Sequence, residues 1–151
     1  MHADTVAAVI FKDGKFLMIE EETPYGLRLN QPAGHVETGE TFEAAVVREA
    51  IEEACVRIAP DHLLAVYARK GKADSGEKQK LYRRHAFVAH IDEELPFENH
   101  SPEICRRLWM SIDEIRSEKA RLRGDCTLET LEDFLRIRTL FHPASRIDSH
   151  C

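Results

Sequence analysis

Hydrophobic positions along the chain recur in two patterns, one typical of strands and one typical of helices. Residues 6–11 and 15–20 are rich in strand-forming residues, and Asp13-Gly14 stands between them. An Asp-Gly pair between two such runs predicts a tight hairpin, because both central residues of its turn need positive φ. Similar runs predict further strands at residues 63–69, 80–91 and 107–110.

Helical spacing of apolar residues predicts three helices. The first covers residues 41–54, and Ser111 with Glu114 forms a capping box that begins the second. The third covers residues 127–141 and precedes Pro143, which a helix interior does not tolerate. The intervening stretch 23–40 is rich in Gly and Pro, so we expect it to be mostly loop.

Length and composition predict a single globular domain. The chain has 151 residues, of which 43% are hydrophobic and 32% are charged. Strands that alternate with helices favour an α/β fold over residues 1–143, and residues 144–151 are predicted to form a disordered tail.

Charge and cysteine usage exclude several classes of protein. The net charge of −6 disfavours a protein that binds nucleic acid through a basic face. No apolar run approaches the roughly 18 residues of a membrane span, so we expect no membrane partner. The four cysteines include no C-x-x-C pair, which is typical of reduced thiols and favours a cytoplasmic location.

Three carboxylates crowd one side of the first predicted helix. Glu49, Glu52 and Glu53 fall within an arc of about 100°, apart from the apolar positions. Such residues often form a solvated charged face. Here Arg48 is the only cation nearby, and like charges at helical spacing repel one another. A hard dication would stabilise this patch, because Mg²⁺ prefers carboxylate oxygens and shares its remaining positions with substrate phosphates.

The residues around this helix resemble the Nudix box, a loop–helix–loop signature of pyrophosphate-cleaving hydrolases. From Gly34 the chain runs five residues to Glu40, seven more to Arg48-Glu49, and ends with Glu52-Glu53-Ala54-Cys55-Val56. Every charged position and spacing matches over 23 residues, and the one departure is Cys55, where the family has glycine. The lead-in NQPAGH, residues 30–35, resembles a bacterial subgroup of Nudix phosphatases.

The resemblance implies a fold and a metal site. The fold would be the Nudix α/β/α sandwich, with a central mixed sheet between helices. Glu49 and Glu53 would be the main ligands of Mg²⁺ or Mn²⁺, and Glu52 would complete the cluster directly or through water. Many members add a distant carboxylate, for which Glu103 is the first candidate and Glu98 the second.

The resemblance also implies roles around the metal. Glu40 would pair with Arg48 and orient the loop against the helix, while Gly34 would let the backbone approach metal or phosphate. A glutamate of the cluster would take the proton from the attacking water. The expected catalytic residues are Glu40, Arg48, Glu52 and Glu53.

Basic residues outside the box are candidates for binding substrate phosphates, because guanidinium groups match phosphate oxygens. The candidates are Arg28, Lys80, Arg83 and Arg84. If residues 80–91 form a strand, Arg83 and Arg84 point to opposite faces, so at most one of them faces the site. Gly34, Arg28 and Arg83 are the expected substrate-binding residues.

The expected function is metal-dependent hydrolysis of phosphoanhydride bonds. The subgroup resemblance implies that small nucleoside di- and triphosphates, or thiamine-pathway pyrophosphates, lose orthophosphate. One alternative is a pool-cleaning hydrolase that releases pyrophosphate from nucleoside triphosphates. Others are a regulatory Nudix module that binds nucleotide without turnover, and an enzyme acting on RNA ends, which the acidic chain disfavours.

Overall fold

The computed structural model describes residues 2–70 and 80–141. The tail expected at residues 144–151 lies outside the described residues, as does Pro143. Within them, no helix combines the length and the apolar character needed to cross a membrane.

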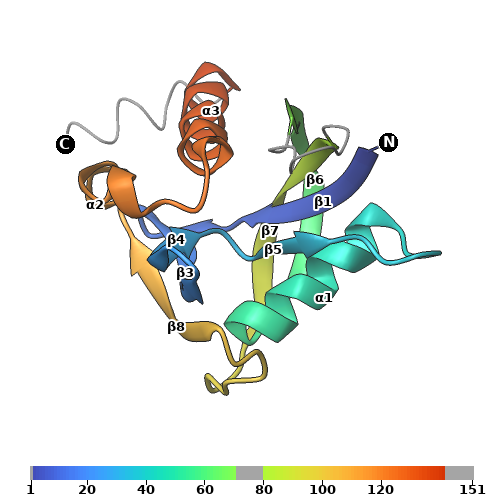
Figure 1. The fold of residues 1–151 in the computed structure, drawn as a ribbon. Helices are drawn as coiled ribbons and strands as arrows, with labels where there is room; N and C mark the ends of the chain where they lie inside the picture. The colour runs from blue at the N-terminus through green and yellow to red at the C-terminus, as the bar shows by residue number, and fades with distance from the viewer. Residues whose placement is uncertain (1, 71–79, 142–151) are drawn as a thin grey trace.

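The first of two sheets is mixed and carries the N-terminal strand in its interior. Its order is β5 (Ala33–His35), β1 (His2–Val9), β7 (Leu81–Glu94) and β6 (Val56–Lys70). β1 pairs with β7 in parallel, whereas β5 and β6 run antiparallel to their neighbours. Figure 1 shows the long β6–β7 pair beside β1.

The second sheet is antiparallel and centres on β3 (Lys15–Thr23). β3 pairs with β2 (Phe11–Lys12), β4 (Gly26–Asn30) and β8 (Ile104–Met110). The predicted hairpin is present, with φ of 52° at Asp13 and 78° at Gly14. Its first arm is only β2, however. Residues 6–11 do not form one strand, because β1 ends at Val9 and belongs to the other sheet.

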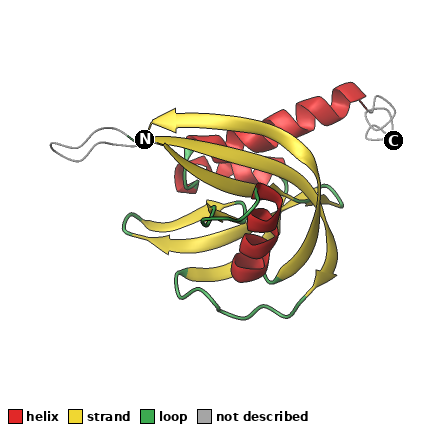
Figure 2. Cartoon of the chain, turned by 90° about the vertical axis from the view of Figure 1, so that its right-hand side faces the viewer, coloured by secondary structure: helices red, strands yellow, loops and turns green. Residues whose placement is uncertain are grey.

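Helices cover the sheets from two sides (Figure 2). α1 (Phe42–Ala54) packs on one side, and α2 (Ile112–Ser117), the short 3-10 helix η1 (Lys119–Arg121) and α3 (Asp125–Phe141) lie on the other. Alternate residues of β3 enter two separate cores: Leu17 and Ile19 join the α1 side, while Phe16 and Met18 join the α3 side. Because β3 is buried on both faces, its residues 16–19 are all apolar and do not alternate with polar ones. The expected α/β fold with a mixed central sheet is confirmed.

The stretch 23–40 contains more strand than its Gly and Pro content predicts. β4 and β5 both lie within it, and β4 pairs with β3 through a turn that needs Gly26, whose φ is 102°. β6 is also longer than predicted. It continues past Pro60 because the register shifts between Pro60 and His62, where the ladder needs no N–H from proline.

The starts of α1 and α2 are capped by side chains, and the cap of α2 is the predicted one. The Thr41 side chain accepts a hydrogen bond from Ala44 N at 3.1 Å at the start of α1, and Ser111 and Glu114 form the reciprocal capping box of α2. α1 ends at Cys55, whose φ of 54° and ψ of 44° are left-handed. This is the position where the Nudix box has glycine.

The Cys55 side chain is packed despite this backbone conformation. It is only 2% exposed, and its Sγ lies 3.3 Å from both O and N of Glu98. The thiol therefore connects the end of α1 to the segment between β7 and β8. The strain of a left-handed non-glycine residue is opposed by these contacts.

Two substitutions at Cys55 separate the backbone effect from the thiol effect. Both Cys55→Gly and Cys55→Ala lose the buried sulfur, but only glycine removes the left-handed strain. We therefore expect the glycine variant to exceed the alanine variant by about 1 kcal/mol in free energy of unfolding. Urea denaturation of both variants and the wild type measures the difference, and equal stability of the two variants would contradict the assigned strain.

Glu20 connects three elements at the end of the second sheet. It is only 6% exposed and accepts hydrogen bonds from Arg106 of β8, at 3.1 Å, and from Arg121 of η1. The hydrogen bond from Arg106, followed by that from Arg121, holds the pKa of Glu20 below its ordinary value. These bonds therefore favour the ionised carboxylate in the folded state.

The lowered pKa predicts how stability depends on pH. A carboxyl whose folded pKa is depressed contributes stability above its unfolded pKa, and this contribution disappears as the pH falls through the folded value. We expect Glu20→Gln to lower the free energy of unfolding by about 1–3 kcal/mol at pH 7. The difference from wild type should shrink below pH 4.5, the ordinary glutamate pKa, in denaturation curves recorded across this range. If the stability difference between Glu20→Gln and wild type stayed constant with pH, the ion pairs of Glu20 would not be its cause.

Candidate active site

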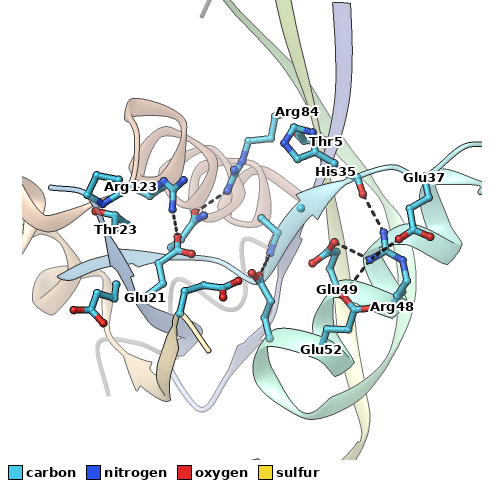
Figure 3. A pocket seen from close by; sticks show the side chains of 17 residues that line it. Thr5, Glu21, Thr23, His35, Glu37, Arg48, Glu49, Glu52, Arg84 and Arg123 are labelled. Atoms are coloured by element: carbon cyan, nitrogen blue, oxygen red, sulfur yellow. Dashed lines mark hydrogen bonds and ion pairs between the residues drawn. The ribbon is translucent and has the colours of Figure 1, made fainter. Parts of the chain in front are cut away.

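A cavity of about 690 Å³ lies where the two sheets meet α1 (Figure 3). α1 contributes Arg48, Glu49, Glu52 and Glu53, while β1, the end of β3, β5 and β7 supply other walls. This volume falls within the range of small-molecule sites. Most of the expected box residues are therefore gathered at one concave surface.

Arg48 joins the loop after β5 to α1. Its Nε and Nη2 donate to Oε2 and Oε1 of Glu40 at 2.8 and 3.0 Å, and Nη2 also donates to His35 O at 2.9 Å. The hydrogen bonds from Arg48 are the main cause that lowers the pKa of Glu40. The Glu40–Arg48 pair expected from the box is thus present, with two parallel bonds.

The same guanidinium also contacts two glutamates of the helix. Nη1 donates to Oε1 of Glu49 at 2.9 Å and to Oε2 of Glu52 at 3.2 Å. With Glu40, and with Glu37 whose Oε1 lies 3.8 Å from Nη1, four carboxylates share this one cation, so the patch retains an excess of negative charge. Glu49 is 9% exposed, and this burial raises its pKa, although Arg48 acts in the opposite direction.

Glu53 is the most strongly perturbed carboxyl of the cavity. Burial raises its pKa to about 8, even though Oε1 accepts a hydrogen bond from Ala33 N at 2.8 Å. The neighbouring carboxylates of Glu49, Glu21 and Glu103 raise this pKa as well. Carboxyls from α1, β3 and the segment before β8 therefore converge here.

Gly34 makes room for a carboxylate. A Cβ atom at this position would overlap with the carboxyl group of Glu49. Glycine therefore allows the Glu49 carboxyl to lie against β5, and a larger residue would displace that carboxyl. Gly34 was expected to let the backbone approach a metal ion or a phosphate. In the structure, its neighbour is the side chain of Glu49.

The cavity contains most of the expected ligands and general acid–base candidates. Glu103 lines it, whereas Glu98 does not and instead contacts Cys55 through its backbone. Glu40 lies behind Arg48 and outside the lining. The predicted residues that line the cavity are Gly34, Arg48, Glu49, Glu52, Glu53 and Glu103.

The expected substrate-binding arginines lie outside the cavity. The side chain of Arg28 folds back on β4, where its Nη1 donates a hydrogen bond to Leu27 O. Arg83 forms an ion pair with Asp4 at 3.0 Å. The lining cations besides Arg48 are Arg84 and Arg123. Strand alternation already indicated that at most one of Arg83 and Arg84 faces the site, and in the structure Arg84 lines the cavity.

The cavity also contains residues that no sequence pattern indicated. Arg123 follows η1 and pairs with Glu21 of β3 at 2.9 Å, so both belong to the lining through tertiary packing. Neither residue is part of a motif.

The carboxylates of the cavity offer the oxygen donors that a metal ion needs, but they are not arranged around a common point. Within residues 2–70 and 80–141, no three His, Cys, Asp or Glu side chains are arranged closely enough to hold one. The donor chemistry nevertheless fits, because oxygen donors suit Mg²⁺ and the carboxylates of Glu49, Glu52, Glu53 and Glu103 line one cavity. Binding a dication would require side-chain rotations, since Arg48 now holds Glu49 and Ala33 holds Glu53.

Comparisons with known proteins agree with this geometry. The model of the NUDIX domain matches residues 1–131. Phosphatase NudJ of Escherichia coli K12 is 30% identical over 127 residues, which cover 84% of this chain and 79% of NudJ. A solved NUDIX hydrolase from Nitrosomonas europaea is 34% identical with a TM-score of 0.80, and the match covers 90% of both chains.

A third likeness supports the fold alone. An ADP-ribose pyrophosphatase from Streptococcus suis has a TM-score of 0.70 at 19% identity, over 91% of this chain and 92% of that one. The family match, by contrast, extends over most of the sequence and includes every charged position of the box. The chain therefore belongs to the Nudix family of hydrolases.

Proposed function

We propose that this Nudix hydrolase removes orthophosphate from small nucleoside di- and triphosphates or related pyrophosphates, thiamine-type pyrophosphates among them, and that it requires Mg²⁺ or Mn²⁺. The observation that carries this proposal is the convergence of Glu49, Glu52, Glu53 and Glu103 on one cavity. The likeness to phosphatase NudJ and the NQPAGH lead-in support release of orthophosphate.

Each residue of the cluster has a role in this proposal. Glu49 and Glu53 would hold the metal, with Glu52 and Glu103 as further oxygen donors. The metal would neutralise the phosphoanhydride and polarise its phosphorus for attack by water. Arg48 keeps the helix carboxylates oriented through its contacts with Glu40 and Glu49, and a glutamate of the cluster takes the proton from the attacking water.

Two other functions receive less support. A regulatory module without turnover would have no need of Arg48 together with Glu49, Glu52 and Glu53. An enzyme for RNA ends would be favoured by a basic surface, and the chain is acidic. A cytoplasmic location is part of our proposal and is supported by free thiols at Cys55, Cys105 and Cys126.

Removal of one cluster carboxylate tests the metal site. We expect Glu53→Gln to lower turnover by about 10²–10⁴-fold, because it removes both an oxygen donor and a candidate base. Glu43→Gln is the matched control, since Glu43 lies on the same helix but is exposed and outside the cavity lining. Released phosphate is measured with Mg²⁺, with Mn²⁺ and in excess chelator.

The metal dependence has its own expected pattern in this assay. Excess chelator should abolish turnover of the wild type and of Glu43→Gln, and added Mg²⁺ should restore it. Near-normal turnover of Glu53→Gln, or full activity in chelator, would contradict a metal site on α1.

The products identify which phosphorus is attacked. With terminal attack, nucleoside triphosphates give the diphosphate and orthophosphate, and thiamine pyrophosphate gives the monophosphate. In ¹⁸O-labelled water, mass spectrometry should find the label in orthophosphate. Pyrophosphate as the first product would instead support a pool-cleaning hydrolase and would leave the metal site unaffected.

A further inference from the structure

Arg84 projects from β7 into the wall of the cavity away from the α1 glutamates (Figure 3). Both hydrogen bonds that it makes within the described part of the chain come from Nη2, which donates to Oδ1 of Asn30 at 3.0 Å and to Oε1 of Gln31. Its Nε is buried and has no hydrogen-bond partner among the described residues. The guanidinium is thus held through Nη2, and its other nitrogens donate no hydrogen bond to the described residues.

A buried polar network fixes the position of this guanidinium. Oδ1 of Asn30 also accepts from Gln31 N at 3.0 Å and from Thr127 Oγ1 at 3.1 Å. Gln31 is fully buried, and its Nε2 donates to Thr127 O at 2.9 Å. The lead-in after β4, the start of α3 and β7 therefore meet at Arg84, which leaves its side chain little freedom. Such pre-organisation reduces the entropy lost when a ligand binds.

The charge of Arg84 has no carboxylate partner within 4 Å among the described residues. The other arginines near it differ: Arg83 pairs with Asp4 at 3.0 Å and Arg123 pairs with Glu21 at 2.9 Å. Burial lowers the pKa of Arg84, although the carboxylates of Glu53 and Glu21 act in the opposite direction, so its environment compensates the cation only in part. An anion in the cavity would compensate it.

The lining indicates what kind of group this anion is. Among the described residues that line the cavity there is no Phe, Tyr or Trp, and His35 supplies the one aromatic ring on which a nucleobase could stack. Phosphate oxygens, in contrast, match the planar donor set of a guanidinium. The cavity therefore favours recognition of phosphate over recognition of a base.

We propose that Arg84 binds the non-bridging oxygens of a substrate phosphate and makes the site selective for a pyrophosphate group irrespective of the attached base. This inference rests on the proposed function, because it assigns one phosphate to Arg84 and leaves its neighbour to the metal ion that the α1 glutamates would hold. It also gives the residues Asn30 and Gln31 a task, which is to hold the guanidinium in place.

A binding measurement tests the proposal without turnover. The probe is methylenediphosphonate, a pyrophosphate analogue that water does not cleave, titrated into the protein with Mg²⁺ in a calorimeter. We expect Arg84→Gln to raise its Kd by about 10-fold or more, since hydrogen bonds to charged groups have this strength. Arg83→Gln is the matched control, because Arg83 is the adjacent residue, points to the other face and pairs with Asp4, and its Kd should stay within about twofold of wild type.

Arg84 also supports the network of Asn30 and Gln31, so folding is checked by thermal denaturation. If Arg84→Gln is unfolded at the assay temperature, the Kd of the analogue is measured with Arg84→Lys instead. This variant keeps the charge but loses the planar donor set. We expect its Kd to lie between those of wild type and a complete loss of binding. Wild-type binding of the analogue by the folded Arg84 variants would overturn the proposal.

Steady-state kinetics with different leaving groups distinguishes phosphate recognition from base recognition. Arg84→Gln should lower kcat/KM by the same factor for adenosine triphosphate, guanosine triphosphate and thiamine pyrophosphate. A loss confined to one base would assign Arg84 to that base and overturn the proposal. If no substrate is hydrolysed while the analogue binding still depends on Arg84, the proposed reaction fails and the assignment of Arg84 stands.

Discussion

The charge of a single guanidinium, that of Arg48, is the constraint on which the site depends. It neutralises Glu40 and reaches Glu49 and Glu52, so it holds the loop after β5 against α1. Glu49 is buried beside Gly34, where an unpaired carboxylate would be strongly unfavourable. Arg48 therefore contributes to holding the loop, the helix and the strand β5 in these positions.

Local signals in the sequence were sufficient for the elements that surround the site. The Asp13-Gly14 turn, the capping box at Ser111 and the spacing of the box from Gly34 to Cys55 each lie within a short segment, and the structure contains all three. Propensity failed where pairing decides the conformation. Gly26–Asn30 forms a strand because β3 offers a partner, and no pattern within the segment reveals that partner.

The cations of the cavity were harder to predict than its carboxylates. The carboxylates share one helix, so their spacing places most of them together, whereas Arg84 and Arg123 come from β7 and the segment after η1. Which of Arg83 and Arg84 faces the cavity depends on the register between β1 and β7, in which Asp4 pairs with Arg83. Asp4 contacts Arg83 and His85 on one face, and this leaves Arg84 on the other.

The parallel pairing of β1 has a consequence for how the chain folds during synthesis. His2 pairs with Leu81 and Val9 with Val88, so β1 lacks one neighbour until β7 has been made. At typical rates of translation this interval is roughly 4–16 s. Until then one edge of a strand destined for the interior of a sheet is open to pairing with other chains. The inner edge of β1 thus stays open while every residue up to β7 is made, although the folded sheet later encloses it.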